Sequence, residues 1–289
     1  MTKRDRAKRL DKLIMAIPKS IQIGFLSIHL YGLVIATAIF VAWWLALKRA
    51  YLYKIPRQKL ESITLLIPLV LGIVGGRLYH VIDKWAYYIL NPAQIIRVDQ
   101  GGLGIWGAIL GIFLGFYIVA RIQKINLLNL LDLIAPSLLL AQGIGRIGNY
   151  INQEGFGPPT SLPWGVYIDL QNRPAQYIQS KYFHPTFFYE MWLDFIFAAL
   201  LTYLAQLSFP RKRESSNKLS PGFRIKSGMT LNRPGQIFGL YLIFYGAIRF
   251  FVEFFRIDTW TVSQFHVSFL ISVLSILIGC VLFFRVKKS

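Results

Sequence analysis

Charged residues and cysteines are scarce in this sequence. Of its 289 residues only 16% are charged, whereas soluble domains carry about 25%. Water is therefore a poor solvent for the chain. Cys280 is the only cysteine, so an internal disulfide and a metal cluster built on cysteines are excluded. The sequence also lacks an internal repeat of the kind that marks transporters built from inverted halves.

Long apolar runs take the place of the missing charge. Hydrophobic residues make up 55% of the chain, and they gather in runs of about 20 residues, the length that crosses hydrocarbon as a helix. No alternation of apolar and polar residues suggests a membrane barrel. We therefore predict an all-α, polytopic membrane protein of about seven transmembrane helices with a small extracytoplasmic lobe. The predicted helices are Ile28–Leu47, Ile63–Val81, Gly102–Ala120, Leu127–Ile147, Phe187–Leu207, Ile237–Phe255 and Phe265–Phe284.

The basic residues are distributed in a way that predicts orientation. The chain has 32 lysines and arginines against 13 acidic residues. Most of them lie after the first, third and fifth predicted helices and at the C-terminus, and the loops between are nearly neutral. Cytoplasmic loops carry such an excess, so we expect a cytoplasmic C-terminus and an N-terminus outside. The first residues, MTKRDRAKRLDK, would alone favour the opposite orientation. This pattern accounts for the net charge of +19 without a nucleic-acid partner.

Composition divides the chain into a membrane domain and accessory segments. Residues 1–27 are predicted to form a basic N-terminal arm, and residues 28–289 the seven-helix domain. Within that domain, residues 155–186 contain several prolines and a tryptophan, and we expect an ordered extracytoplasmic lobe there. Residues 209–235 are rich in Ser, Lys, Arg and Pro. They are too polar to build a core, so we expect a disordered cytoplasmic loop.

Several charged residues interrupt the apolar runs. Arg77, Arg146 and Arg249 all fall near the outer ends of predicted helices. A charge at the centre of a membrane helix costs about 2.5–3.5 kcal/mol, so each one indicates a function. A lone arginine near a helix end commonly extends to the headgroups, and Glu253 is spaced to pair with Arg249. Together the arginines favour a phosphate site, because the guanidinium fork matches phosphate oxygens. In a membrane that phosphate belongs to a lipid headgroup.

The segment Gly145–Gly157 reads GRIGNYINQEGFG and combines an arginine, amides and a glutamate with closely spaced glycines. It resembles the signature of the bacterial prolipoprotein diacylglyceryl transferase family, with Tyr150 in place of the usual Phe. The blocks HLYG, GGR, GGLGIWG, HPTFFYE and YGAIRFFVEFFR extend the resemblance over most of the chain. Seven helices with an external N-terminus also agree with that family.

The resemblance implies a transferase of the bacterial cytoplasmic (inner) membrane. The family moves the diacylglyceryl group of phosphatidylglycerol to the lipobox cysteine of preprolipoproteins, forming a thioether and releasing glycerol phosphate. The expected partners are therefore phosphatidylglycerol and preprolipoprotein signal peptides. We expect no metal, no organic cofactor and a monomer. Two alternatives stay open: a phospholipid-binding transporter or flippase that uses the same arginines, and an inactive relative of the transferase.

The same resemblance assigns roles to individual residues. Arg146 and Arg249 would hold the lipid phosphate, and with Glu154 they are the expected catalytic residues. Residues expected to bind substrate are Tyr31, Arg77, Gly102, Trp106, Asn149, Asn152, Gly157, Tyr245, Glu253 and Arg256.

Trp106 marks a departure from the family. It stands where a histidine often serves as the base that takes the thiol proton. A tryptophan side chain cannot accept a proton. Either another residue is the base, with Glu154 ranked ahead of His80 and Asp99, or the field of the arginines and water suffice.

Overall fold

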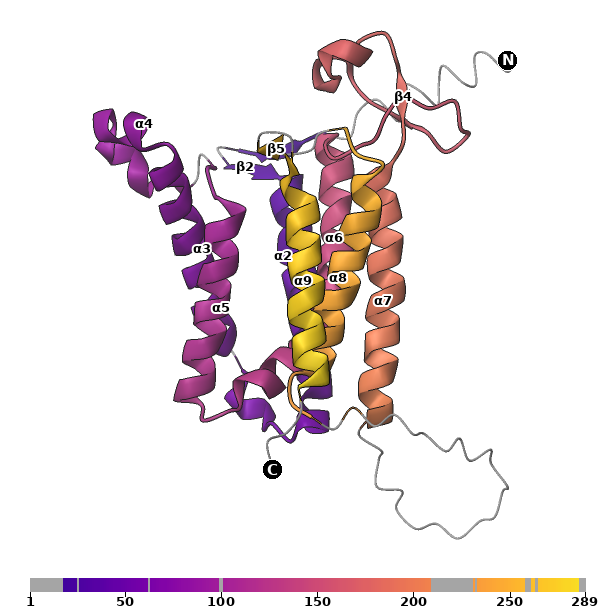
Figure 1. Ribbon diagram of the computed structural model, residues 1–289. Helices are drawn as coiled ribbons and strands as arrows, with labels where there is room; N and C mark the ends of the chain where they lie inside the picture. The colour runs from indigo at the N-terminus through magenta and orange to yellow at the C-terminus, as the bar shows by residue number, and fades with distance from the viewer. Residues whose placement is uncertain are drawn as a thin grey trace. The chain divides into compact units, whose positions relative to one another are not determined.

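The structure is a computed structural model that describes residues 18–24, 26–61, 63–98, 101–208, 231, 233–257, 261–262 and 265–285. Within these ranges seven helices are long and apolar enough to cross a membrane (Figure 1). They are α2 (Leu30–Arg49), α3 (Ile63–Asp83), α5 (Ile105–Ile122), α6 (Leu127–Asn152), α7 (Thr186–Ser208), α8 (Gln236–Glu253) and α9 (Val267–Phe284). The predicted class, a mostly helical protein with seven candidate transmembrane helices, is confirmed.

The remaining elements are short and lie before α2 or between the long helices. Three antiparallel hairpins pair β1 (Ser20–Ile23) with β2 (Leu26–His29), β3 (Val166–Tyr167) with β4 (Tyr182–Phe183), and β5 (Thr261–Val262) with β6 (Phe265–His266). The short helices are α4 (Trp85–Leu90), η1 (Ala50–Tyr53), η2 (Arg57–Lys59), η3 (Pro92–Ile96), η5 (Leu170–Asn172) and η6 (Ala175–Tyr177).

α6 is longer than its apolar run. We predicted an end at Ile147, but the helix continues to Asn152, so most of the signature segment is helical. No proline lies between Ile147 and Pro158, and polar side chains of the last turns find partners inside the protein. The helix ends where Gln153 adopts a left-handed conformation, with φ of 56°. Arg146 therefore lies inside a helix rather than at its end.

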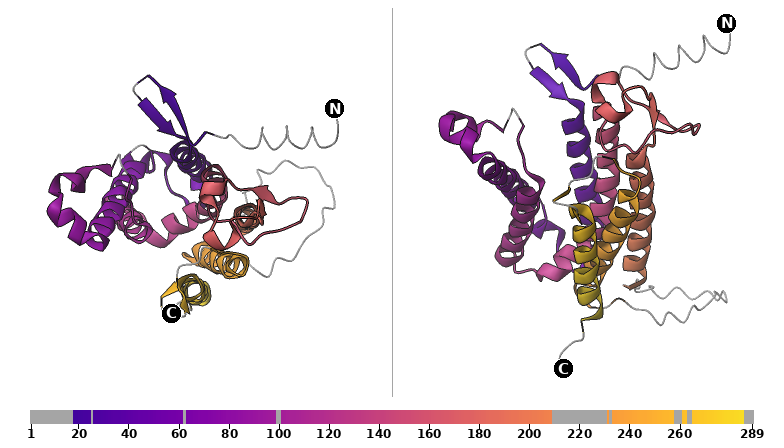
Figure 2. Two further views of the ribbon diagram at one scale, coloured as in Figure 1. Left: turned by 90° about the horizontal axis from the view of Figure 1, so that it is seen from above. Right: turned by 45° about the horizontal axis from the view of Figure 1, so that its top comes forward.

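The described chain divides into two compact units. The first contains the residues up to Leu45 and those from Ile134 onward. It contains most of α2 and α6 together with α7, α8 and α9. α8 runs beside α9 in both figures (Figures 1 and 2). Apolar side chains of α6, α7 and α8 form its core, which includes Leu139, Leu201 and Ile248.

The second unit contains residues Ala46–Leu133 and is built on the pair α3 and α5. Their backbones approach directly, because glycines face each other across the pair. A β-carbon at Gly111 would lie 2.0 Å from the carbonyl oxygen of Leu71, so only glycine fits there. Such close approach through small residues is typical of helix pairs in membranes.

The segment predicted as a lobe has a small apolar core of its own. Phe156, Ile168, Phe183 and Phe187 are buried against one another. Phe183 lies in β4, and Ile168 directly follows β3. A further bridge joins Pro159 to Phe183. Much of the predicted basic arm, residues 1–17, and most of the predicted cytoplasmic loop, residues 209–230 and 232, lie outside the described residues.

Candidate active site

Three helices of the first unit bring charged side chains together. Glu190, near the start of α7, lies at the centre, and its side chain is only 3% exposed. Arg146 on α6 donates from Nη2 to Glu190 Oε1. Arg249 on α8 donates from Nη1 to both carboxylate oxygens, at 3.3 and 3.2 Å. Two arginines that lie far apart in the sequence therefore share one buried carboxylate.

Glu253 completes this group of charges. Arg249 Nη2 donates to Glu253 Oε2 at 3.3 Å, and the Glu253 side chain is 1% exposed. This is the pair that the four-residue spacing on α8 predicted. We call Arg146, Glu190, Arg249 and Glu253 the arginine–glutamate cluster. Its formal charges cancel, which lowers the cost of burying four ions.

Glu190 is the residue that sequence reasoning missed. It belongs to the block HPTFFYE, but the resemblance gave it no individual role. Two facts could have found it. A lone carboxylate within a membrane helix needs a cationic partner, and two arginines near the same depth offered one.

α2 and the last turns of α6 border Arg146. Its Nη1 lies 3.5 Å from Oδ1 of Asn149, one turn further along α6. Gly148 leaves room for the ring of Tyr31, since a β-carbon there would lie 2.6 Å from the ring atom Cδ2. Tyr31 is itself 37% exposed. The structure thus brings Tyr31 and Asn149 to the surroundings of Arg146.

The loop after α6 carries the second half of the signature. Asn152 Nδ2 donates to Glu154 Oε1 at 3.3 Å, and Glu154 is exposed. Arg256, just beyond α8, lies against the same loop: its Nη2 is 3.7 Å from the β-carbon position of Gly155. Asn152 and Glu154 therefore belong to the signature segment itself, and Arg256 packs against it. Glu154 also interacts electrostatically with Tyr31, which borders Arg146.

Gly157 lies where three segments meet. Its backbone N–H donates to the carbonyl of His184 at 2.8 Å. A β-carbon at Gly157 would lie 2.3 Å from the carbonyl oxygen of Phe255. The signature loop, the residues before α7 and the end of α8 thus pack backbone against backbone, which explains the need for glycine. This contact fixes the ends of the helices that carry the arginine–glutamate cluster.

Tyr245 lies on α8, one turn before Arg249, and interacts electrostatically with it. Its ring stacks on Tyr241, with centroids 6.2 Å apart. The Tyr241 hydroxyl accepts a hydrogen bond of 3.2 Å from Gln142 Nε2 on α6. Tyr245 therefore links the arginine–glutamate cluster to the hydrogen-bonded pair of Tyr241 and Gln142.

Arg77 is held quite differently, in the second unit. It is buried, and its guanidinium donates to four backbone carbonyls, those of Gln94, Ile95, Gly101 and Gly102, at 2.5 to 3.0 Å. These bonds use four of the five N–H groups of an arginine. The side chain thereby holds η3 and the glycine turn before α5 in place.

The other residues predicted for this site in the second unit surround the same turn. Gly102 has φ of 75°, and a β-carbon there would lie 2.8 Å from His80 Nε2. His80 on α3 also meets the ring of Tyr88 edge-on, at 6.0 Å between centroids. Trp106 is half-buried in the first turn of α5. Asp99 lies outside the described residues.

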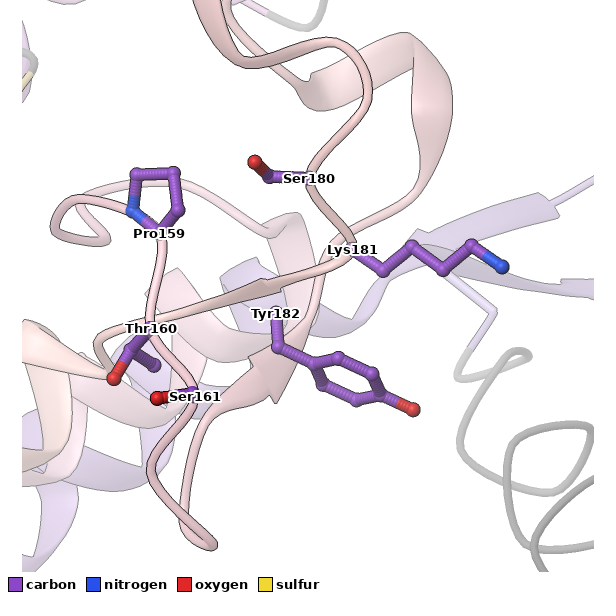
Figure 3. Close-up of a pocket in the computed structure, with 6 residues that line it drawn as sticks. All are labelled: Pro159, Thr160, Ser161, Ser180, Lys181 and Tyr182. Carbon is purple, nitrogen blue, oxygen red and sulfur yellow. The ribbon is translucent and has the colours of Figure 1, made fainter.

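The lobe has a shallow hollow of about 350 Å³, separate from these residues. Figure 3 shows Lys181 and Tyr182 extending the same way, with Thr160 and Ser161 on the neighbouring loop segment. None of the residues that we predicted for the site lines this hollow. It offers one ammonium and several hydroxyl groups, but no cluster of charges.

Among the described residues, no group of three or more His, Cys, Asp or Glu side chains is placed to hold a metal ion. The chemistry that the first unit offers is that of two guanidinium groups facing one carboxylate. Arginines held in this way can exchange a carboxylate for another anion, phosphate above all, because both present oxygens to the same fork.

Fold and site together define a class: a polytopic helical membrane protein with paired arginines and glutamates buried between its helices. The family is shown by comparison with known proteins. The family model described as prolipoprotein diacylglyceryl transferase matches residues 18–285. The chain therefore belongs to the prolipoprotein diacylglyceryl transferase family, and the resemblance noted in the sequence is confirmed.

Individual relatives match over nearly their whole length, and all three named below are called phosphatidylglycerol–prolipoprotein diacylglyceryl transferase. The protein of Thermosynechococcus vestitus is 33% identical over 261 residues, which cover 90% of this chain and 89% of that protein. That of Clostridium novyi is 34% identical over 268 residues, covering 93% and 95%. That of Listeria innocua is 34% identical over 277 residues, covering 94% and 91%.

Proposed function

We propose that this protein transfers the diacylglyceryl group of phosphatidylglycerol to the lipobox cysteine of prolipoproteins. Family membership supports the reaction, since the relatives carry both substrates in their names. Arg146 and Arg249 converge on one carboxylate, that of Glu190. This observation is the basis for assigning the phosphate site to these two arginines. A lipid phosphate that enters this position would take the place of the Glu190 carboxylate.

The proposed chemistry uses the arginines as an electrostatic clamp. The cysteine sulfur attacks the glyceryl carbon, so a C–S bond forms while the C–O bond to the phosphate breaks. The thiol proton is lost, and glycerol phosphate leaves with the electron pair of the broken bond. Guanidinium groups fixed beside the leaving phosphate stabilise the charge that develops on it. Arg146 and Arg249 are suited to this task because they are already held in position.

The other predicted residues have supporting roles in this proposal. Glu154 is exposed beside the signature loop, and we assign it the role of base for the thiol. Tyr31 and Asn149 border Arg146, and Tyr245, Asn152, Arg256 and Gly157 frame the headgroup. Glu253 holds Arg249 in place. Arg77, Gly102 and Trp106 shape the turn before α5, where Arg77 acts through the backbone carbonyls that it binds.

The location follows from the charge pattern of the loops. We propose that the protein lies in the bacterial cytoplasmic (inner) membrane as a monomer, with its N-terminus outside and its C-terminus in the cytoplasm. The signature loop and the lobe would then face outward, on the side where a lipobox cysteine is presented.

The test is a transfer assay on the purified full-length protein. It is mixed with phosphatidylglycerol and a lipobox peptide, and the mass of the lipidated peptide is followed. We expect Arg146→Ala and Arg249→Ala each to lower turnover about 100-fold to 1000-fold or more, the usual cost of removing one preorganised donor. Arg57→Ala is the matched control, since that arginine is exposed and its side chain pairs with Glu61 at 3.3 Å in the second unit.

Two results would contradict the proposal. Product formed at the wild-type rate by both cluster variants would remove the phosphate clamp. Lipid movement across the bilayer without any peptide adduct would instead favour the transporter alternative.

A further inference from the structure

Asp194 is a buried carboxyl group that the proposed chemistry leaves unused. It lies on α7 four residues after Glu190, so it occupies the same helix face one turn further on. It is 2% exposed. Its Oδ2 is buried and has no hydrogen-bond partner in the part of the chain that the structure describes. A buried polar atom without a partner calls for an explanation.

α6 packs closely against Asp194. A β-carbon at Gly143 would lie 3.2 Å from Asp194 Cβ and 2.5 Å from the ring of Phe195. Gly143 is one turn before Arg146, as Asp194 is one turn from Glu190. The two antiparallel helices therefore place Asp194 one turn away from the Arg146–Glu190 pair. Gln142 on α6 donates to Tyr241, which interacts electrostatically with Asp194.

The groups that face Asp194 come from both neighbouring helices. From α6 comes Arg146, and from α8 come Arg249, Tyr245 and Tyr241, and each of these interacts electrostatically with Asp194 or with its partner Glu190. The remaining titratable groups around the cluster are Glu253 on α8 and Tyr31, which interacts with Arg146 from α2. Gln142 Oε1 is a second buried oxygen without a partner among the described residues.

The charges of this site oppose the binding of a further anion. Arg146 and Arg249 contribute two positive charges, Glu190 and Glu253 contribute two negative charges, and an ionised Asp194 contributes a third. A phosphodiester headgroup adds one more negative charge at every pH near neutrality. Further negative charge is strongly disfavoured in a buried, low-dielectric site. One proton taken up by Glu190 and Asp194 returns the site to the charge that it had before the lipid bound, and it leaves the pair with one shared negative charge.

We propose that binding of an anionic lipid phosphate at Arg146 and Arg249 is coupled to the uptake of about one proton by the Glu190–Asp194 pair. This inference rests on the proposed function. The proton comes from solvent, and the phosphodiester keeps its own charge. Once the pair is singly protonated, its hold on the arginines weakens and their forks turn to the phosphate. Asp194 is thus a positioning residue, which acts on the substrate through Glu190.

Calorimetry of the full-length protein in a neutral detergent tests this coupling. Short-chain phosphatidylglycerol is titrated in two phosphate-free buffers that differ in their enthalpy of ionisation, and the difference in heat counts protons. For the wild type we expect uptake of about one proton per bound lipid and an apparent Kd that rises about tenfold per pH unit above neutrality, as linkage requires. Neutral diacylglycerol should bind without proton uptake.

Asp194→Asn keeps the size of the side chain and removes its titrating proton. We expect proton uptake to fall to less than half and the Kd to lose most of its pH dependence. A merely structural Asp194 would change affinity without changing the proton count. Asp83→Asn is the matched control, since this aspartate on α3 is 49% exposed and pairs with Lys84. It should keep the full proton count.

The outcomes separate this inference from the proposed function. Phosphatidylglycerol that binds to the wild type with no proton uptake, or to Asp194→Asn with full uptake, would overturn the coupling and leave the transfer reaction standing. Absence of any binding, or binding that Arg249→Ala leaves unchanged, would overturn the proposed function itself. If Asp194→Asn fails to fold, the wild-type comparison of phosphatidylglycerol with diacylglycerol decides the question alone.

Discussion

Arg77 is buried and Arg249 is partly buried, both on helices long and apolar enough to span a membrane, and they are held in opposite ways. Arg77 donates to four backbone carbonyls of its own unit. Arg249 donates to the carboxylates of Glu190 and Glu253. Carbonyl groups belong to the chain and cannot be exchanged, whereas a carboxylate can be displaced by another anion.

The difference separates an arginine that holds structure from arginines that can bind a ligand. Removing Arg77 would release a turn of the backbone. Removing a partner of Arg249 would leave a charge that a new anion could balance. Burial alone does not distinguish the two cases, because Arg77 is 8% exposed and the Arg249 side chain 15%. The chemical identity of the acceptor distinguishes them: backbone carbonyls for Arg77 and carboxylates for Arg249.

The largest effect is expected for Glu190→Gln, which removes the shared carboxylate charge. Glu253 would then be the one carboxylate of the cluster that still binds an arginine, so the free energy of unfolding should fall by about 3–5 kcal/mol. Phosphatidylglycerol should stabilise this variant more than the wild type, because the lipid supplies the missing charge. Thermal unfolding in detergent, with and without the lipid, measures both.

Glu61→Gln is the control for that variant. Glu61 also pairs with an arginine, Arg57, but its side chain is 52% exposed, and exposed pairs contribute about 0–1 kcal/mol. Equal stability of the two variants would show that the Glu190 pairing is no stronger than a surface contact. A lipid effect no larger in Glu190→Gln than in the wild type would contradict the exchange of anions.

A smaller loss is expected for Arg77→Lys. The ammonium group lacks the planar fork that reaches four carbonyls, and each buried acceptor left without a partner costs about 1–3 kcal/mol. Stability should fall, and phosphatidylglycerol should not restore it beyond its effect on the wild type. Arg121→Lys, at the exposed end of α5, should be neutral. Rescue of Arg77→Lys by the anionic lipid would place Arg77 among the ligand-binding arginines instead.

Two glycines of the signature helix allow a finer test around Arg146. A β-carbon at Gly148 would lie 2.6 Å from the Tyr31 ring, whereas one at Gly145 would lie 3.7 Å from Ile35 Cδ1, an ordinary contact. Gly148→Ala should displace Tyr31 and lower turnover by up to about 100-fold, as small misplacements do. Gly145→Ala should retain turnover. Equal activity of both variants would mean that the position of Tyr31 does not matter.

The helices could be predicted from sequence because hydrocarbon thickness fixes their length. Apolar runs located all seven, and the largest difference in their bounds is the end of α6, predicted at Ile147 and found at Asn152. Arg146 and Arg249 stood out because isolated charges in apolar runs are rare, and the spacing on α8 correctly paired Arg249 with Glu253.

The partners that could not be predicted are those set by packing between helices. Glu190 reaches Arg146 from another helix, and no spacing along the chain records that contact. Arg77 resembles Arg249 in sequence, as an arginine in an apolar run, but its acceptors are backbone carbonyls, and every residue has one. Acceptors of that kind leave no trace in the amino-acid sequence.

The smallest change is expected for Trp106→His, which restores a proton acceptor at the start of α5. If Glu154 or water already takes the thiol proton, turnover should stay at the wild-type level. If the reaction lacks a base, turnover should rise, since base catalysis contributes about 10²–10⁴-fold, and its pH profile should gain an inflection in the neutral range where histidine titrates. Trp106→Phe is the control, because it keeps an aromatic ring without an acceptor. Complete loss of turnover in both variants would show that the indole itself is indispensable to the reaction.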